Sequence, residues 1–517
     1  MDTTDIGNRR VFWFNGQALV ESSQYLRILQ NRPVKHPDNP VVTADQPWEG
    51  TCIQLWTAVD YDPASGQWQM WYEGHPKGVV MCTALSGDGI RWHKPDLNQV
   101  AYDGSAHNNI YLDTSYRDAH SPAVVKAPAG GDPARRYLMY YWVAPEWHWM
   151  GERAEHIDPR LRPYRVNGHY LATSADGLHW TPQTEAPVLA GRQGKNAAWG
   201  DRSPANGDRT PANENDLWMT IGDTNAVFFD EQTGKYRSYH KLNKMNPGWD
   251  LRRRCVGTAE SEDGAHWSRS IPILDPTEED DAWARALGGI RAEFYGLHVW
   301  PQSGFYLGLL WMFQVTKTGE PPFGRGWDDG PITPHLIYSL DGLRWERLPV
   351  REPFIPLGPA GSFEAGTVYS GDRPTVVGDK LRFYYHGVSY THGATDPIES
   401  PNYLTGIAFA TLRRDRYVAW QGGTIPGVLD TVPLRFAGRE LRLNIDAAHG
   451  AAKVTLLAAD DSSLPGYSLE ECDPITADSL DQVVRWRGSS DLSALQGQAI
   501  RLRFLLRHSA LYTWQFT

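Results

Sequence analysis

The stretch SGDGIRW at residues 86–92 occurs four times along the chain in slightly varied form. The other copies are SADGLHW at 174–180, SEDGAHW at 261–267 and SLDGLRW at 339–345. A degenerate fifth copy, ATLRRDRYVAW at 410–420, follows after a similar interval. Self-similarity at a regular period indicates a fold built from repeated structural units.

Each copy follows two apolar segments joined by turn-forming residues, which is typical of a β-hairpin. The first such pair is CIQLWTAVDYDPASGQWQMWYEG at 52–74, and the last is RPTVVGDKLRFYYHG at 373–387. A third apolar strand precedes the Asp-Gly turn, and a fourth opens at the Trp. Four antiparallel strands repeated five times predict an all-β protein with a five-bladed β-propeller. Two β-sandwiches, the other fold considered, would not produce five matched hairpins.

The Asp-Gly pair is expected to form the tight turn between the third and fourth strands, with glycine supplying a positive φ. The Trp is expected to pack between neighbouring blades. We therefore expect the turn acids to lie at outer turns, away from any chemistry: Asp88, Asp176, Asp263 and Asp341.

The repeated turn stops after about residue 421, while short alternating strands and glycine-rich turns continue. We therefore predict two domains. Residues 1–421 would form the propeller and carry the catalytic site, and residues 422–517 would form a C-terminal β-sandwich.

Composition narrows the function. The 517 residues carry a formal net charge of −11, which argues against nucleic acid as the main partner. Aromatic residues make up 12%, including 22 Trp and 24 Tyr, and suit both β structure and stacking on sugar rings. We find no CxxC pair, long apolar run or signal peptide, so we expect no metal site, cofactor or membrane span. The location is expected to be cytoplasmic, or secreted with the signal removed, and a homo-oligomer is left open.

In a propeller the first strands of all blades line one channel, so residues just before them should converge at one end. Every repeat has an acid at this position, and these leading acids are Glu49, Asp118, Asp223, Glu293 and Glu364. Converging carboxylates among aromatic residues suit glycoside hydrolysis, which needs one protonated and one ionised carboxyl group. Crowded acids should raise the pKa of one of them. We predict Asp223 and Glu293 as the acid/base pair and Glu49 as a third catalytic carboxylate.

Further residues near the first strands, or at the ends of the second strands, should reach the same opening. They are predicted to bind a carbohydrate substrate together with Asp118 and Glu364: His120, Trp142, His240, Arg291, His298, Trp311 and His386.

Five blades, an acid leading each inner strand and a trailing sandwich resemble the five-bladed glycoside hydrolases of families 32, 43, 62, 68, 117 and 130. The layout is most similar to family 32. Of the family 32 motifs, Arg117-Asp118-Ala119 matches Arg-Asp-Pro in part, which would make Asp118 a transition-state stabiliser. The motif Trp-x-Asn-Asp-Pro-Asn-Gly is absent, with only HPDNP at 36–40 near its place, and Glu471-Cys472 falls in the sandwich.

The prediction is therefore a glycoside hydrolase acting on a fructoside, arabinoside or related sugar. Three alternatives stay open: a transglycosidase or phosphorylase using the same site, a propeller that binds glycans without catalysis, and a scaffold for protein partners.

Overall fold

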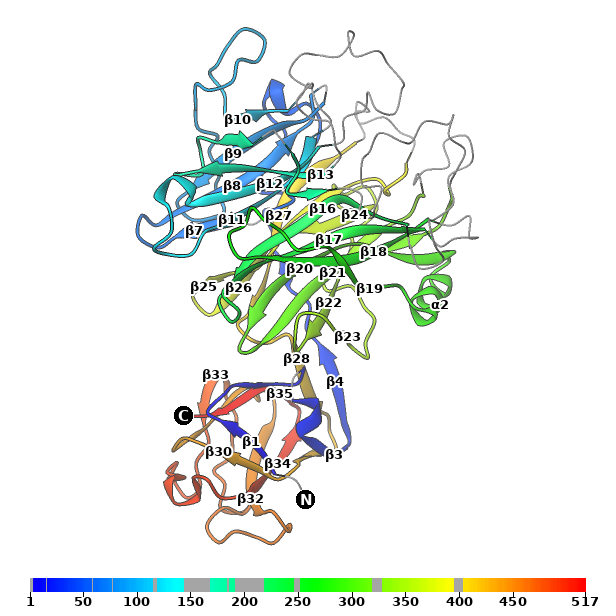
Figure 1. The fold of residues 1–517 in the computed structure, drawn as a ribbon. Helices are drawn as coiled ribbons and strands as arrows, with labels where there is room; N and C mark the ends of the chain where they lie inside the picture. The colour runs from blue at the N-terminus through cyan, green and yellow to red at the C-terminus, as the bar shows by residue number, and fades with distance from the viewer. Residues whose placement is uncertain are drawn as a thin grey trace. The chain divides into compact units, whose positions relative to one another are not determined.

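The computed structural model describes residues 3–14, 16–57, 59–76, 78–114, 119–143, 168–183, 186–190, 218–245, 252–318, 328–394 and 403–517. The chain divides into two compact units. The propeller unit comprises Lys35–Thr375 and Arg382–Ala410, and the sandwich unit comprises Met1–Val34, Val376–Leu381 and Thr411–Thr517. Both are built almost entirely from β-strands, which confirms the predicted fold class (Figure 1).

Repeats one to three of the propeller unit each form a separate sheet. The first sheet contains β6 (Ile53–Gln54), β7 (Val59–Asp62), β8 (Gln67–Gly74), β9 (Val80–Ser86) and β10 (Ile110–Asp113). The second contains β11 (Ala119–Lys126), β12 (Tyr137–Val143), β13 (Gly168–Ser174), β14 (Thr181–Gln183) and β15 (Leu189–Ala190). The third contains β16 (Trp218–Asp230), β17 (Lys235–Met245), β18 (Arg252–Ser261) and β19 (Ile271–Leu274).

Repeats four and five share one nine-stranded sheet, in which a parallel pair, Ile332 with Thr367, joins β22 to β24. Its strands are β20 (Arg291–Gln302), β21 (Phe305–Val315), β22 (Ile332–Ser339), β23 (Trp345–Arg347), β24 (Thr367–Ser370), β25 (Thr375–Val377), β26 (Lys380–Val388), β27 (Thr405–Arg413) and β5 (Val34–Lys35). The predicted hairpins form in all five repeats, and the blade count itself stays a prediction.

The four repeated turns have one structure. In SGDGIRW, Oδ1 of Asp88 accepts hydrogen bonds from the backbone N–H groups of Ile90 and Arg91, both at 2.8 Å. The Ser86 hydroxyl donates to Asp88 and accepts from the N–H of Gly89, whose φ is +69°. The other three copies repeat this pattern. The turn acids are thus structural, as predicted.

Each repeated turn also accepts a hydrogen bond from the preceding repeat, which for the first turn is repeat five. The glycine carbonyl accepts a hydrogen bond from an aromatic side chain on the second strand of the neighbour. The four pairs are Trp71 with Gly177 (2.8 Å), Tyr140 with Gly264 (2.7 Å), Tyr239 with Gly342 (3.0 Å) and Tyr384 with Gly89 (2.6 Å). The last pair connects repeat five to repeat one, and the motif's Trp packs on the same neighbour in each case.

The sandwich unit consists of two six-stranded sheets. One contains β1 (Thr4–Gly7), β3 (Val20–Gln24), β29 (Gly427–Thr431), β30 (Leu434–Phe436), β32 (Ala451–Ala458) and β34 (Ile500–Arg507). The other contains β2 (Val11–Phe12), β4 (Leu26–Gln30), β28 (Val418–Gly422), β31 (Leu441–Asp446), β33 (Asp478–Val483) and β35 (Ser509–Phe516). Aromatic rings fill the space between them; those of Phe436 and Phe516 stack at 3.8 Å.

Two features differ from the sequence expectation. The blue strands β1 to β4 lie among the orange and red strands of the sandwich, whereas residues 1–421 were all expected in the propeller (Figure 1). The helix α2 (Glu278–Ala286) was not expected, and its start is a capping box between Thr277 and Asp280. No helix in the described part of the chain is long and apolar enough to cross a membrane.

The hydrogen bonds between repeats predict that two glycine-to-alanine substitutions lower the free energy of unfolding by different amounts. At Gly264, with φ +74°, an added Cβ would lie 2.6 Å from Leu138 and 2.8 Å from the Tyr140 hydroxyl. At Gly66, with φ +69°, it would meet nothing within 4 Å. Both changes strain the backbone by about 1–2 kcal/mol. Gly264→Ala should lose about 1–3 kcal/mol more, because it also disturbs a buried hydrogen bond.

Urea unfolding of Gly264→Ala and Gly66→Ala measures this difference. Equal losses of unfolding free energy would mean that the turns do not hold neighbouring repeats together.

Candidate active site

Four of the five leading acids lie within the described residues, and each is paired with its own cation. Asp118 lies outside the described residues. The pairs are Glu49 with Lys94, Asp223 with Lys241, Glu293 with Arg254 and Arg291, and Glu364 with Lys35. Each described leading acid thus lies in an ion pair of its own, and the exposure of its side chain decides whether it can contact a substrate.

Glu49 is fully buried at the end of the 3-10 helix η2 (Pro47–Glu49). Its Oε2 accepts from the backbone N–H groups of Asp45 (2.9 Å) and Gln46 (3.0 Å) and from Lys94 Nζ (2.7 Å). Its Oε1 accepts from the Tyr72 hydroxyl at 2.5 Å. Four donors therefore occupy both oxygens, and Glu49 is anchored at the start of repeat one with no exposed surface.

Glu293 is also fully buried. Oε2 accepts from Arg254 at 2.6 Å, and Oε1 accepts from Nε and Nη2 of Arg291 at 3.0 and 2.8 Å. Both arginines also approach Oδ2 of Asp328, at 3.5 and 2.8 Å. Two carboxylates and two guanidinium groups thus form a closed network, which satisfies the requirement that buried charges be paired.

Glu364 lies just before β24 and is mostly buried, with 8% of its side chain exposed. Its Oε2 lies 2.9 Å from Lys35 Nζ, and the Lys35 ammonium also donates to the carbonyl of Pro356. Glu364 is thus a paired acid with little surface open to a ligand.

Asp223 is different, because 26% of its side chain is exposed. Its Oδ1 pairs with Nζ of Lys241, and its Oδ2 lies 4.0 Å from Nε2 of His120. Nζ of Lys241 also lies 4.0 Å above the ring of Tyr295. We call Asp223, His120, Lys241 and Tyr295 the Asp223 cluster. It brings together side chains from β11, β16, β17 and β20.

Local backbone features aim Asp223 and Lys241 at each other. Between Ile221 and Asn225, β16 advances four residues while β17 advances only two, from Leu242 to His240. Such irregularities redirect side chains. A Cβ atom at position 222 would lie 2.5 Å from Cε of Lys241, so only glycine leaves the lysine room to pass.

The charge of Asp223 follows from this surrounding. Burial raises the pKa of the carboxyl group, but the Lys241 ammonium and, after it, His120 outweigh burial and hold the pKa well below its usual range. Asp223 is therefore not the acid whose pKa crowding was expected to raise. This carboxylate is ionised at neutral pH, which suits a nucleophile, base or charge stabiliser and not a proton donor.

Aromatic side chains pack on one another next to the Asp223 cluster. The Tyr369 ring lies 5.8 Å from Tyr295 and 5.2 Å from Trp311, and it stacks on His386 at 4.8 Å. Trp311 and His386 have no exposed surface. The faces of these two rings pack against other core residues. Neither ring is exposed for contact with a sugar, in contrast to the prediction.

The remaining predicted binding residues are also interior. His240 is fully buried between the hydroxyls of Ser238 and Ser270, at 2.8 and 2.6 Å, and burial lowers its pKa to about 3. His298 is 2% exposed, and burial lowers its pKa to about 4. Trp142 is 7% exposed and packs edge-on against His169. Only His120 and Asp223, of the predicted residues described, lie together at an accessible place.

Tyr295 and Asp328 belong to the surroundings of the site but were not among the predicted residues, and His392 lies beside them. The Tyr295 hydroxyl lies 3.0 Å from Nε2 of His392, whose Nδ1 lies 3.1 Å from the carbonyl oxygen of Asp328. Burial lowers the pKa of His392 to about 4. The only signal for Tyr295 in the sequence is its position two residues after Glu293. In the described part of the chain, no group of three or more His, Cys, Asp or Glu side chains is arranged to hold a metal ion.

No protein-family model matches the sequence. A search of curated proteins likewise finds no match. Solved structures that match include an N-acetylgalactosamine deacetylase from F. plautii in complex with blood group B trisaccharide. It is 15% identical with a TM-score of 0.41, and the match covers 76% of this chain and 96% of that one.

Two further matching structures are enzymes of other kinds. A β-1,2-mannobiose phosphorylase from Listeria innocua is 11% identical with a TM-score of 0.39, over 74% of this chain and 96% of that one. A GH32 β-fructofuranosidase from Bombyx mori is 11% identical with a TM-score of 0.37, over 94% of this chain and 92% of that one.

The closed network around Glu293 predicts a structural loss on substitution. Glu293→Gln leaves two buried guanidinium groups short of negative charge and should lower the free energy of unfolding by about 3–5 kcal/mol. Glu260→Gln is the control, because its 37%-exposed carboxylate forms partly exposed pairs with Arg237 and Lys235. Such pairs are worth about 0–1 kcal/mol. Chemical denaturation measures both, and a fully stable Glu293→Gln protein would return Glu293 to the catalytic candidates.

Proposed function

We propose that this chain is a glycoside hydrolase whose active site is the Asp223 cluster, with Asp223 as the ionised carboxylate. One observation carries the proposal: among the four leading acids described, Asp223 alone has a substantially exposed side chain, and Lys241 keeps it charged. The all-β propeller and the resemblance read from the sequence support the same substrate class.

The chemistry follows from the charge of Asp223. Cleavage of a glycosidic bond develops positive charge at the anomeric carbon. A carboxylate held ionised beside that carbon can stabilise the charge, attack the carbon, or take a proton from the attacking water. Lys241 serves as a positioning residue, because it fixes the carboxylate without touching the sugar in this proposal.

The second role, protonation of the leaving oxygen, we assign to the start of β11. His120 lies there, 4.0 Å from Asp223, with 22% of its side chain exposed. Asp118 precedes it by two residues in the sequence. Rates of His120→Gln and Asp118→Asn on substrates with good and poor leaving groups separate the two. Loss of the proton donor slows poor leaving groups far more than good ones.

The direct test is Asp223→Asn, assayed on a panel of aryl furanosides and pyranosides together with fructans and arabinans. Removing the ionised carboxylate should lower kcat/KM by about a hundredfold or more. Asp263→Asn is the matched control, because Asp263 caps an outer turn of the same repeat and asparagine retains the accepting oxygen.

Full activity of Asp223→Asn on a confirmed substrate would overturn the proposal. Binding of glycans without turnover by the native chain would favour the non-catalytic alternative. Turnover that requires inorganic phosphate would indicate a phosphorylase using the same site.

A second prediction concerns pH. Lys241 lowers the pKa of Asp223, so Lys241→Met should raise that pKa. A higher pH is then needed to ionise the carboxylate, and the acid limb of the kcat/KM profile should move to higher pH. Lys94→Met removes the cation beside Glu49 and should leave the acid limb in place. A shift of the acid limb with Lys94→Met and not with Lys241→Met would instead identify Glu49 as the ionised catalytic group.

A further inference from the structure

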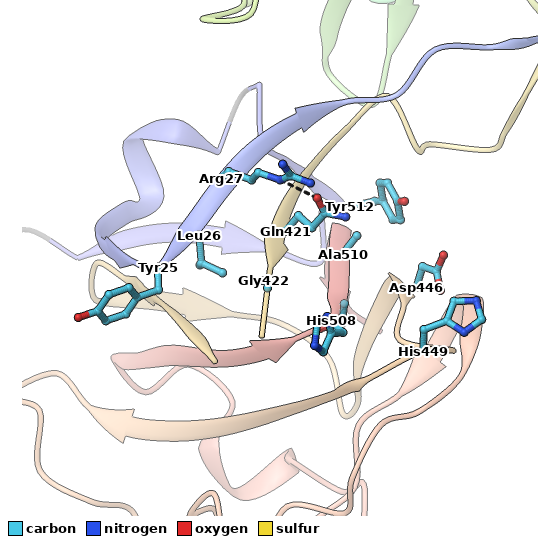
Figure 2. A pocket seen from close by; sticks show the side chains of 12 residues that line it. Tyr25, Leu26, Arg27, Gln421, Gly422, Asp446, His449, His508, Ala510 and Tyr512 are labelled. Atoms are coloured by element: carbon cyan, nitrogen blue, oxygen red, sulfur yellow. Dashed lines mark hydrogen bonds between the residues drawn. The ribbon is translucent and has the colours of Figure 1, made fainter. Parts of the chain in front are cut away.

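The sandwich unit contains a hollow of about 680 Å³ that has no residue in common with the Asp223 cluster (Figure 2). It lies where the chain crosses four times from one sheet of the sandwich to the other. These crossings are β3 to β4 at Tyr25, β28 to β29 after Gly422, β31 to β32 after Asp446, and β34 to β35 at His508. Connections gathered at one end of a β-sandwich are a common place for binding residues.

The floor of the hollow is a row of four residues across neighbouring strands. Arg27 on β4 pairs with Gln421 on β28, Gln421 pairs with Ala510 on β35, and Ala510 pairs with Asp446 on β31. Directly paired residues share one face of a sheet. Three strand spacings give the row a length of about 14 Å. The small Ala510 side chain leaves a depression between longer polar ones, and we call this row with its surroundings the sandwich groove.

Several polar side chains of the sandwich groove are held in position by one hydrogen bond and have further polar atoms without a partner in the described residues. Nε of Arg27 donates to Oε1 of Gln421 at 2.8 Å, which fixes both side chains (Figure 2). Within the described residues, neither Nη atom of Arg27 nor Nε2 of Gln421 has a hydrogen-bond partner. Asp446 accepts from the Ala448 N–H through Oδ1 at 3.2 Å, and its Oδ2 has no partner in the described chain.

The chemistry of these atoms identifies the class of ligand. Arg27 and Gln421 offer donors and Asp446 offers an acceptor, while the charges of Arg27 and Asp446 balance. An anionic ligand would meet the carboxylate, and a cationic ligand would meet the guanidinium. A neutral ligand with several hydroxyl groups, each able to donate and accept, satisfies both. The ring of Tyr25, 72% exposed, lies at the same end and offers an apolar face.

Two residues of the sandwich groove hold an unusual backbone conformation. Tyr25 has φ +56° and His508 has φ +44°, in the left-handed region that favours glycine. Bulky residues retained in this region tend to cluster at functional sites. From the row, its uncommitted atoms and the exposed ring, we propose that the sandwich groove binds a neutral oligosaccharide, separately from the proposed active site.

The experiment uses the full chain carrying Asp223→Asn, so that turnover does not consume the ligand. It is applied to an array of plant and microbial polysaccharides that includes fructans, arabinans, mannans, xylans and galactans. Affinity electrophoresis then measures the dissociation constant for each polysaccharide retained. Adding Arg27→Ala or Asp446→Ala should weaken binding about tenfold or more. Arg439→Ala, at a 73%-exposed sandwich residue outside the groove, should not change it.

Absence of binding on the array, or binding that both groove variants retain in full, would overturn the sandwich groove as a glycan site. Thermal unfolding of each variant checks that the sandwich is intact. In the chain with native Asp223, the groove variants should keep the native rate on a small aryl glycoside. Failure of the proposed active site and failure of the groove are therefore observed separately.

Discussion

The pairing of each described leading acid with a cation is the constraint on which the site depends. A carboxylate without exposure to water is stable only when donors occupy its oxygens. Lys94, Arg254 with Arg291, and Lys35 meet this need for Glu49, Glu293 and Glu364. A substrate that reached the oxygens of these three acids would have to displace the paired cation. Asp223 is also paired with a cation, but part of its side chain is exposed. This difference in exposure distinguishes the proposed catalytic acid from the three buried acids.

The repeated turn shows how far the sequence can lead. Ser-x-Asp-Gly-x-x-Trp predicts a turn, and this prediction is correct because the hydrogen bonds that shape the turn join residues at most three positions apart. The spacing of its copies predicts repeated hairpins, which the structure contains. The contacts between repeats were predicted only in part. Packing of the Trp on a neighbouring repeat was expected, whereas the hydrogen bond from Tyr140 or Tyr239 to a glycine carbonyl was not. The donor lies more than a hundred residues from its acceptor, and no pattern in the sequence relates the two.

The parts of the fold and site that the sequence did not predict depend on contacts between residues on different strands. Strands β1 to β4 are short and carry no repeat, so nothing in the sequence associates residues 1–34 with the last hundred. On β17, His240 and Lys241 point to opposite faces because successive side chains alternate. The irregular pairing of β16 decides which of them meets Asp223. Leading acids can be found by alignment of repeats, and Arg291 lies two residues from Glu293 in the sequence. The other cations, Lys94, Lys241, Arg254 and Lys35, lie farther from their acids in the sequence, and their pairing becomes visible only in three dimensions.

The central claim is that Asp223 is an ionised carboxylate held by Lys241. Infrared difference spectra between the native chain and Asp223→Asn measure this directly, recorded from about pH 4 to about pH 8 around the range in which carboxyl groups ordinarily titrate. Our account predicts that the native chain shows the additional carboxylate band at every pH in this range. A protonated-carboxyl band that Asp223→Asn removes near neutral pH would contradict it, since Asp223 would then be a proton donor.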